Sequence, residues 1–437
     1  MSAAHATSTI PVQELRVGMY VHLDVGWFAH PFPLSSFRIE RDEQIQTIRE
    51  LGLAQVRWSP GLSEAAEPPA STVHEQAATE PATAAATPTA SGATETAQQA
   101  EQRRRREALA AERASLALCE RQYAEAAREW RRSAELVGAD PGGARERTEA
   151  LSRALVDKML GQPESCIRLL GVGAGDRAGA HALNVSIVAL LLGRLIGLDA
   201  DAMTELGVGA LLHDIGKLEL PDRVRYPDET FTSAETRLYR EHVAHGVSQG
   251  RRMGLAAGAL LVIAQHHEQA DGGGFPQQLD GTRMTPAARI VALVNRYDNL
   301  CNPLQPGRAR TPHEALSLLY AQRSHYSAEV VNGFVRMMGV YPPGSIVQLS
   351  DDRWALVTSV NAARPLKPRV LVHDHRVARD EALYLDLERE PELGIRRAVK
   401  PQQLPPEAAQ YLAPTVRVSY YFESAPPRDD GLPGAPA

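Results

Sequence analysis

Apolar positions recur with helical spacing through the middle of the chain. Between residues 145 and about 340 they fall three or four positions apart, and short polar, glycine or proline breaks divide the pattern into segments. These segments are 149–160, 181–196, 202–213, 234–253, 257–267, 286–300, 312–321 and 328–338. Their apolar faces are wide, as expected for helices that pack into an all-α core. We therefore predict a mainly α protein, with a helical domain over residues 145–345.

The two ends of the chain show the alternation of short strands instead. Residues 1–61 combine one helical pattern, which ends at Gly52, with short apolar runs between turn residues. The predicted strands are 10–12, 18–23 and 56–58, and the predicted helix is 42–51. We expect a small α+β module there. After Pro342-Pro343-Gly344 the pattern alternates again, which predicts a β-rich C-terminal subdomain over residues 346–424.

Three further segments differ in composition. Residues 62–100 are dominated by Ala, Thr, Glu and Pro and contain few large apolar side chains. Such a segment cannot bury enough surface to offset its ordering entropy, so we predict a disordered linker, and likewise a disordered tail over residues 425–437. Residues 101–144 are rich in Ala, Glu and Arg and should form a charged helix. A homodimer could form through residues 101–136 as a coiled coil, but only a partial heptad is formed by Leu109, Leu116, Tyr123 and Trp130.

Composition narrows the classes of partner. The net charge is −6, whereas nucleic-acid-binding proteins usually carry a basic surface, so we do not expect non-specific binding of nucleic acid. The three cysteines are far apart, which favours reduced thiols. The N-terminus lacks the pattern of a signal peptide, and the apolar runs are too short to span a bilayer. We predict a cytoplasmic protein without a nucleic-acid or membrane partner.

The candidate chemistry begins at the end of one apolar helix. His213 and Asp214 are adjacent there, Gly216 permits a sharp turn, and Lys217 lies beside the pair. An imidazole next to a carboxylate suits a site with two metal ions, because the carboxylate can bridge both. One histidine on an apolar helix is more often a core residue. The helical region, however, places further histidines at helix ends, namely His181, His242, His266 and His267. Together they predict a dinuclear site that activates water.

The order of these motifs resembles the HD-GYP family. The motifs are His181, then His213-Asp214-Ile215-Gly216-Lys217, then His242-x-x-x-Gly246, then His266-His267-Glu268-x-x-Asp271-Gly272-x-Gly274-Phe275-Pro276. Proteins of that family are bacterial metal-dependent phosphodiesterases that hydrolyse cyclic di-GMP to pGpG or GMP. The resemblance covers roughly residues 150–345 and implies a helical HD-superfamily core. Residues 11–19 also resemble the small domain of unknown function that often precedes such modules.

The resemblance implies a role for each matching position. The implied metal ligands are His181, His213, Asp214, His242, His266, His267 and, where the family has a ligand Asp, Asn295. Asp214 would bridge two divalent ions, iron or manganese, and Asp214 and Lys217 would be the catalytic residues. The implied substrate-binding residues are Lys217, the loop residues Gly274, Phe275 and Pro276, and Arg308 and Arg310, which lie where the family has its Arg-Pro-Tyr segment.

Departures from the family pattern keep other functions open. Asn295 offers a carbonyl oxygen but no negative charge, so it should weaken at least one metal site, and Asp298 is an alternative ligand one helical turn later. In some members of the family a Glu that binds a third metal ion occupies the position of Arg177, so Arg177 argues against a trinuclear site. Phe275 replaces the family's Tyr and lacks its hydroxyl group. The leading function is a cyclic di-GMP phosphodiesterase. The alternatives are a degenerate module that binds cyclic di-GMP or a partner without turnover, and a phosphohydrolase acting on another nucleotide.

Overall fold

The computed structural model describes residues 8–24, 36–63, 97–162, 164–171, 176–226, 230–412 and 417–424. The chain forms two compact units, Met1–Ala110 and Ala111–Ala437. Most of the predicted linker lies outside the described residues, and the predicted tail lies wholly outside them. The helix α2 (Ala97–Leu136) begins inside the region predicted as linker.

The N-terminal unit is a small α+β module, as its apolar pattern predicts. Its four-stranded antiparallel sheet has the order β1-β4-β2-β3. The strands are β1 (Ser8–Pro11), β2 (Tyr20–His22), β3 (Ser36–Arg38) and β4 (Gln55–Trp58), and the helix is α1 (Asp42–Glu50). Ile45 and Ile48 of α1 pack with Val21, Ile39 and Val56 in its core.

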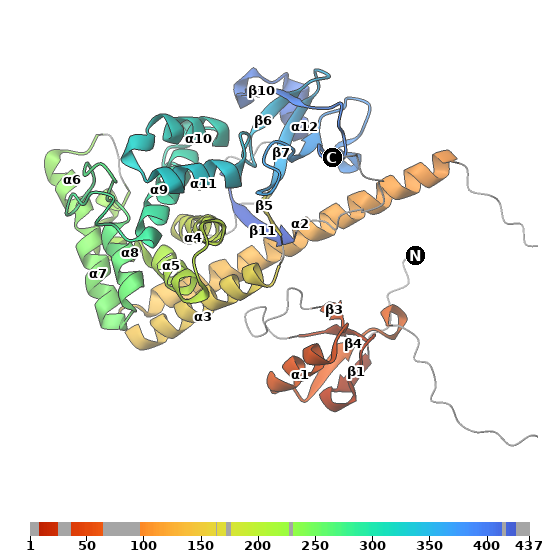
Figure 1. Ribbon diagram of the computed structural model, residues 1–437, viewed down its shortest axis with the longest axis horizontal. Helices are drawn as coiled ribbons and strands as arrows, with labels where there is room; N and C mark the ends of the chain where they lie inside the picture. The colour runs from red at the N-terminus through yellow and green to blue at the C-terminus, as the bar shows by residue number, and fades with distance from the viewer. Residues whose placement is uncertain are drawn as a thin grey trace, which may run out of the picture. The chain divides into compact units, whose positions relative to one another are not determined.

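The larger unit is mainly helical, so the predicted fold class is confirmed. Figure 1 shows α4 viewed end-on among the surrounding helices. The helices are α3 (Pro141–Leu160), α4 (Arg177–Ile196), α5 (Ala200–Leu212), α6 (Ser233–Arg240), α7 (His242–Met253), α8 (Ala257–Gln265), α9 (Pro286–Cys301), α10 (Pro312–Ala321) and α11 (Ala328–Met338). The single helix predicted over residues 234–253 is wrong, because the chain breaks at Glu241 into α6 and α7. This break makes His242 the first residue of α7.

Helix α4 is the core helix of this unit. Among the described residues it is the one helix that is long and apolar enough to cross a membrane, yet 72% of that apolar window is buried inside the protein. The apolar sequence of α4 is therefore accounted for by packing against its own chain.

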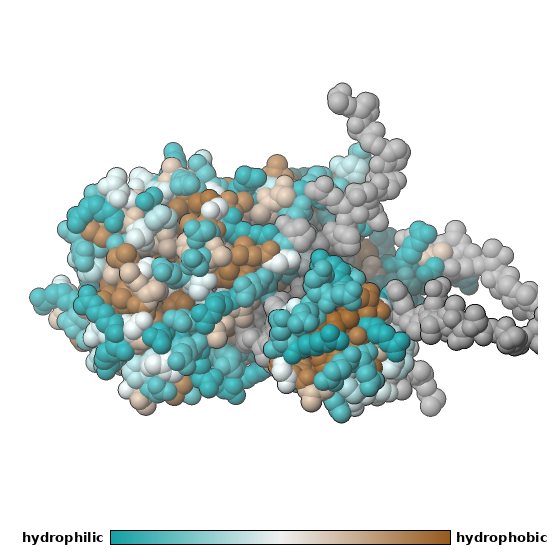
Figure 2. All heavy atoms as spheres, turned by 60° about the horizontal axis from the view of Figure 1, so that its bottom comes forward, coloured by the Kyte–Doolittle hydropathy of each residue, from teal (hydrophilic) through white to brown (hydrophobic). Residues whose placement is uncertain are grey.

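On the face drawn in Figure 2, hydrophobic residues form separate patches among polar ones.

A seven-stranded antiparallel sheet packs beside the helices. Its strands follow the order β10-β6-β7-β5-β11, and β8 pairs with β7 and β9. They are β5 (Ser165–Leu169), β6 (Ile346–Leu349), β7 (Trp354–Asn361), β8 (Arg369–Val372), β9 (Leu383–Asp386), β10 (Ile395–Val399) and β11 (Tyr420–Ser424), with a short helix α12 (Pro406–Leu412). Strand β5 lies between the predicted helices 149–160 and 181–196, within the predicted helical domain, and pairs with β7 and β11. The sheet therefore combines one strand that precedes α4 in the sequence with strands that follow α11.

The second half of α2 packs on the helical core. Tyr123 donates a hydrogen bond to the carbonyl of Ala180 (3.2 Å), and the Trp130 indole donates one to the carbonyl of Leu211 (2.8 Å). Both rings are buried in their own chain. Two positions of the partial heptad are thus occupied within the protomer, and the homodimer stays a prediction.

Candidate metal centre

The His-Asp pair lies where two backbones touch. His213 and Asp214 follow α5, and the short 3₁₀ helix Ile215–Glu219 comes next. A Cβ on Gly216 would lie 2.0 Å from the carbonyl oxygen of His242 and 2.3 Å from the amide nitrogen of Gly246. Only glycine permits this approach. The close contact brings the start of α7, and with it His242, next to Asp214.

The helix ends fix the orientation of three histidine rings. Each ring contacts, through Nδ1, the backbone carbonyl three residues earlier: His213 with Ala210 (2.7 Å), His242 with Tyr239 (2.5 Å) and His266 with Ile263 (2.8 Å). A carbonyl oxygen can only accept, so Nδ1 carries the proton in each ring. The Nε2 lone pair of each ring is therefore available to a metal ion.

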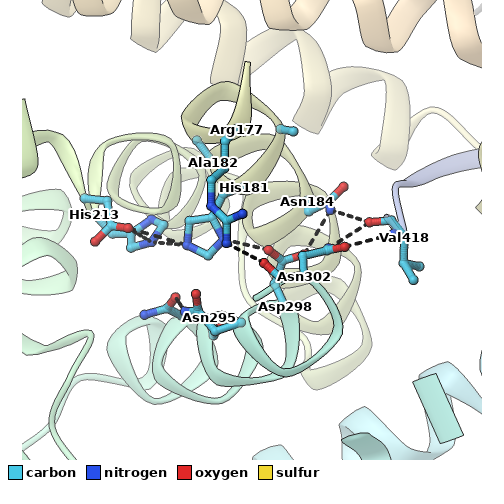
Figure 3. Close-up of polar contacts among 12 residues, drawn as sticks. Arg177, His181, Ala182, Asn184, His213, Asn295, Asp298, Asn302 and Val418 are labelled. Carbon is cyan, nitrogen blue, oxygen red and sulfur yellow. Dashed lines mark hydrogen bonds and ion pairs between the residues drawn. The ribbon is translucent and has the colours of Figure 1, made fainter. Parts of the chain in front are cut away.

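A fourth ring is held by a carboxylate. His181 Nδ1 lies 2.6 Å from Asp298 Oδ2, and its Nε2 lies 3.2 Å from the Nε2 of His213 (Figure 3). A second pair of Nε2 atoms, from His242 and His266, is 3.3 Å apart. Two nitrogens bound at about 2.1 Å to one ion, with a right angle between the bonds, would be separated by about 3 Å. The spacing of both pairs fits a shared metal ion.

Asp214 lies between the two pairs. Its Oδ2 is 3.5 Å from the Nε2 atoms of His181 and His213, and its Oδ1 is 3.6 Å from those of His242 and His266. Oδ1 is buried and has no hydrogen-bond partner among the described residues, and the same is true of Nε2 of His267. Buried polar atoms without partners are rare unless a ligand satisfies them. The two candidate sites are His181, His213 and Asp214, and Asp214, His242, His266 and His267.

The electrostatics favour metal binding over protonation. Burial lowers the pKa of His213 and His267 well below the ordinary value and that of His242 to about 3. These rings are therefore neutral at physiological pH, the form that binds metals. Burial alone would raise the pKa of Asp214, but the positive charge of the neighbouring Lys217 opposes burial, and this pKa lies well below its usual range. A neutral imidazole set around one carboxylate fits a divalent transition metal.

Asp298 contacts the candidate ligand His181 and is not in either candidate cluster. Its Oδ2 accepts from His181, and its Oδ1 accepts from the side-chain amides of Asn184 and Asn302, each at 2.9 Å. Both oxygens are thereby engaged, which favours the orienting role over the alternative that Asp298 replaces Asn295. Asn295 itself is buried, and its side-chain oxygen accepts from Asn299 at 2.7 Å. Figure 3 shows Asn295 on the same helix as Asp298, and its role as a ligand stays a prediction.

Lys217 is adjacent to the bridging carboxylate. Its Nζ lies 2.6 Å from Asp214 Oδ2 and 5.4 Å from the centre of the Tyr239 ring. Burial opposes the charge, but Asp214 outweighs burial and raises the pKa of Lys217 above its ordinary value. Lys217 is therefore a fixed positive charge, and it lines the same cavity as His181 and Asp214.

The glycine-rich loop packs an aromatic ring against His267. The Phe275 ring stacks on the His267 ring, with centroids 4.4 Å apart and planes 18° apart. A Cβ on Gly274 would come within 2.5 Å of the backbone of Glu268, so this loop also needs glycine. Among the described residues that line the cavity, Gly274, Phe275 and Pro276 do not occur. The predicted contact of these three residues with substrate stays a prediction.

Glu268 is a functional residue whose role the sequence reasoning missed. It is buried, and its two carboxylate oxygens accept from the backbone amides of Gln277 (2.7 Å) and Leu279 (2.9 Å). It thereby anchors the loop that carries Phe275. A charged residue directly after two candidate ligands and before a glycine-rich loop is a signal that could have revealed this role.

Two adjoining hollows give access to the centre. A cavity of about 80 Å³ contains His181, Asp214 and Lys217, and a groove of about 750 Å³ contains Arg308 and Arg310. Both are lined in part by the same residues, Arg177, Tyr226 and Asn299. The two predicted arginines therefore line a groove that shares wall residues with the metal cavity, and their contact with substrate stays a prediction.

Comparison with known proteins gives two family matches. Residues 162–330 match the HD domain, and residues 7–148 match a domain of unknown function, DUF3391. A cyclic di-GMP phosphodiesterase of Pseudomonas aeruginosa is 28% identical over 375 residues, which are 83% of this chain and 84% of that protein. The cyclic di-GMP phosphodiesterase response regulator RpfG of Xanthomonas campestris is 34% identical over 142 residues, 32% of this chain and 37% of that protein. A solved HDG"Y"P protein of Bdellovibrio bacteriovorus is 13% identical, with a TM-score of 0.39, over 75% of this chain and 98% of that chain.

Proposed function

This chain belongs to the HD-domain proteins and carries a DUF3391 domain ahead of its HD domain, and we propose that it is a metal-dependent phosphodiesterase that hydrolyses cyclic di-GMP. The observation that carries the proposal is the junction of two histidine clusters through a single carboxylate, Asp214. Two relatives that match the chain at 28% and 34% identity are named as cyclic di-GMP phosphodiesterases. Hydrolysis of a phosphodiester is chemistry that paired metal ions support.

We propose two divalent ions, iron or manganese, as the cofactors. His181, His213 and Asp214 would hold the first, with Asn295 as a neutral fourth ligand, and Asp214, His242, His266 and His267 would hold the second. Such ions supply Lewis-acid activation of the phosphoryl group and lower the pKa of bound water. Because Asn295 would contribute no charge as a ligand, the first ion should be the more weakly bound.

The side chains around the ions have separate tasks. Asp298 holds the His181 ring in position through the 2.6 Å contact with Nδ1, as carboxylate partners do for metal-bound histidines. Lys217 restrains Asp214 from one side and presents a point charge in the cavity, where an oxygen of the scissile phosphate would lie. Lys217 and Asp214 are the residues that we assign to catalysis. Glu268 and Phe275 keep His267 in place from the opposite side.

The compartment, the partners and the product of the enzyme can also be proposed. We propose a cytoplasmic signalling enzyme without a nucleic-acid or membrane partner, consistent with a net charge of −6. A homodimer would use the exposed part of α2, since Tyr123 and Trp130 are buried within the protomer. The product is the linear dinucleotide pGpG or, after a second cleavage, GMP.

The test is product analysis with protein purified without oxygen and reconstituted with Mn²⁺ or Fe²⁺. Cyclic di-GMP is incubated with the wild type, with Asn295→Asp and with Asp214→Asn, and the products are separated by chromatography. We expect release of pGpG or GMP by the wild type, a higher rate for Asn295→Asp at low metal concentration, and no release by Asp214→Asn. If the wild type binds cyclic di-GMP without product and only Asn295→Asp turns it over, the protein is a degenerate binding module. If neither turns it over with either metal, the proposed activity is wrong.

A further inference from the structure

Arg177 places a guanidinium beside the metal centre. It is the first residue of α4, one helical turn before His181, so both side chains lie on one face of the helix. Figure 3 shows both reaching from α4 toward α9. Arg177 Nη2 donates to the carbonyl of Asn302 (2.7 Å), and its guanidinium carbon lies 5.2 Å from the centre of the Tyr226 ring. The guanidinium is thus held in a defined place in the cavity wall.

Among the described residues no acid forms a salt bridge with Arg177. Its side chain is partly buried, and Asp298 acts on its charge without a direct contact. Burial, followed by the positive charge of nearby Arg417, lowers the pKa of Arg177 from its ordinary value. Arg417 lines the same cavity. The contacts of this guanidinium are a backbone carbonyl and an aromatic ring, and its other N–H groups are suited to an anion that arrives with the ligand.

The groove beside Arg177 has the same sign of charge. Its arginines are Arg177, Arg296, Arg308 and Arg310, and no aspartate or glutamate occurs among the described residues that line it. Between the arginines lie apolar side chains, such as Leu300 and Leu318. Tyr226 lines both the groove and the metal cavity, so the two spaces adjoin each other. A groove of this kind accommodates a ligand that combines phosphate with a flat base.

A cyclic dinucleotide has two phosphodiesters, and the metal centre can act on only one of them at a time. If the proposed function holds, the second phosphodiester needs its own cation. Lys217 is already assigned to the phosphate at the metal centre, and Arg177 is a second cation of the same cavity, one helical turn before His181 on α4. We propose that Arg177 binds the uncleaved phosphodiester of the substrate, and that the arginine-lined groove holds the nucleotide attached to it. Guanidinium groups bind phosphate oxygens through two parallel hydrogen bonds and remain charged at all physiological pH values.

This arrangement makes Arg177 a specificity-determining residue. A substrate with one phosphodiester uses only the metal centre, whereas a cyclic dinucleotide also uses Arg177. Removal of Arg177 should therefore penalise the cyclic dinucleotide selectively. A charged hydrogen bond of this type corresponds to a loss of about tenfold to hundredfold in binding.

The experiment compares two substrates with the full-length, metal-loaded protein. The kcat/KM values are measured for cyclic di-GMP and for bis(p-nitrophenyl) phosphate, which has a single phosphodiester, with wild type, Arg177→Gln and Arg177→Lys. We expect the ratio of the two values to fall about tenfold to hundredfold in Arg177→Gln, mainly through KM for cyclic di-GMP, and to recover partly in Arg177→Lys. The control is Arg397→Gln, an exposed arginine on β10 that donates to Gln348, which should leave the ratio unchanged.

Two results would overturn the inference. One is an unchanged ratio in Arg177→Gln, and the other is an equal loss for both substrates, which would assign Arg177 to the metal centre or to folding. If the wild type hydrolyses neither substrate, the proposed function fails, and calorimetric titration with cyclic di-GMP decides the inference separately. At least tenfold weaker binding by Arg177→Gln than by Arg397→Gln would then support it, and equal binding would refute it.

Discussion

The contact between Gly216 and the start of α7 can be tested with one methyl group. In Gly216→Ala the new Cβ would lie 2.0 Å from the carbonyl oxygen of His242 and 2.3 Å from the amide nitrogen of Gly246. Both atoms belong to the backbone and cannot rotate away. Because real Cβ contacts do not fall below 3.0 Å, the two segments must separate by about 1 Å, the difference between 3.0 and 2.0 Å.

That separation acts on both stability and chemistry. Overpacking of a tight backbone contact costs about 1–3 kcal/mol of unfolding free energy. His242 lies at the moving end of α7, and its Nε2 would be displaced relative to Asp214 Oδ1, from which it is now 3.6 Å away. A misplacement of about 1 Å in a catalytic arrangement costs roughly 100-fold in rate. We therefore expect loss of one bound metal and a fall of about two orders of magnitude in turnover of cyclic di-GMP.

The assays are urea unfolding, elemental analysis of bound metal and turnover at saturating substrate. The matched control is Gly394→Ala, since a Cβ on Gly394 meets no atom within 4 Å. The control should remain within about 0.5 kcal/mol of the wild type. If Gly216→Ala keeps the metal content and the turnover of the wild type within a factor of two, the close contact does not position His242 and the reasoning is wrong.

Three other predictions concern the ligands, the metal and a buried lysine. Asp298→Asn, which weakens the hold on His181, should lower metal affinity about tenfold to hundredfold in a chelator competition, and an unchanged affinity would contradict the orienting role. Chelation should lower the melting temperature, because metal at 100 times its Kd adds about 2.7 kcal/mol of stability; an equal melting temperature would argue against a preformed site. Burial lowers the pKa of Lys158 from 10.5 to about 6, so protonation of Lys158 opposes folding increasingly as the pH falls from 10.5 toward 6. Lys158→Met should therefore raise the melting temperature more at pH 7 than at pH 9, and a larger gain at pH 9 would refute this sign.

The helices were predictable where their apolar faces are wide. The bounds of α10 and α11 agree with the predicted segments 312–321 and 328–338, because Thr311 caps the first and proline or glycine residues follow the second. The helix predicted over residues 149–160 begins earlier, at Pro141, since Asp140 caps it through the amide of Gly143. The break at Glu241 was not predictable from periodicity, because the apolar pattern continues through it.

Strand β5 shows what a local pattern cannot reveal. It has five residues, too few for a period, and contains Arg168, which is almost fully buried. The charge of Arg168 is matched by Glu112 on α2 and Glu423 on β11, at 2.7 Å for the latter. These partners are 56 and 255 residues away in the chain. A strand that depends on such distant partners looks like a polar interruption in the sequence alone.

The residues of the site were predictable from the sequence, but which histidine rings face one another was not. The motifs identify His181, His213, Asp214 and the downstream histidines, and the structure brings them within reach of one another. Which imidazole faces which depends on the helix-end carbonyls and on the Gly216 contact, and neither is visible in the spacing. For the same reason the sequence left Asp298 as an alternative ligand, whereas its oxygens hold His181, Asn184 and Asn302.

The central claim is that Asp214 joins two metal sites in one phosphodiesterase centre. The most direct measurement is the number of metal ions per chain in protein purified without oxygen, determined by elemental analysis on the same sample whose turnover of cyclic di-GMP is recorded. The account predicts two ions per wild-type chain together with release of pGpG or GMP, and loss of both ions and of turnover in Asp214→Asn. Full turnover with one ion or none, or two ions retained in Asp214→Asn, would contradict it.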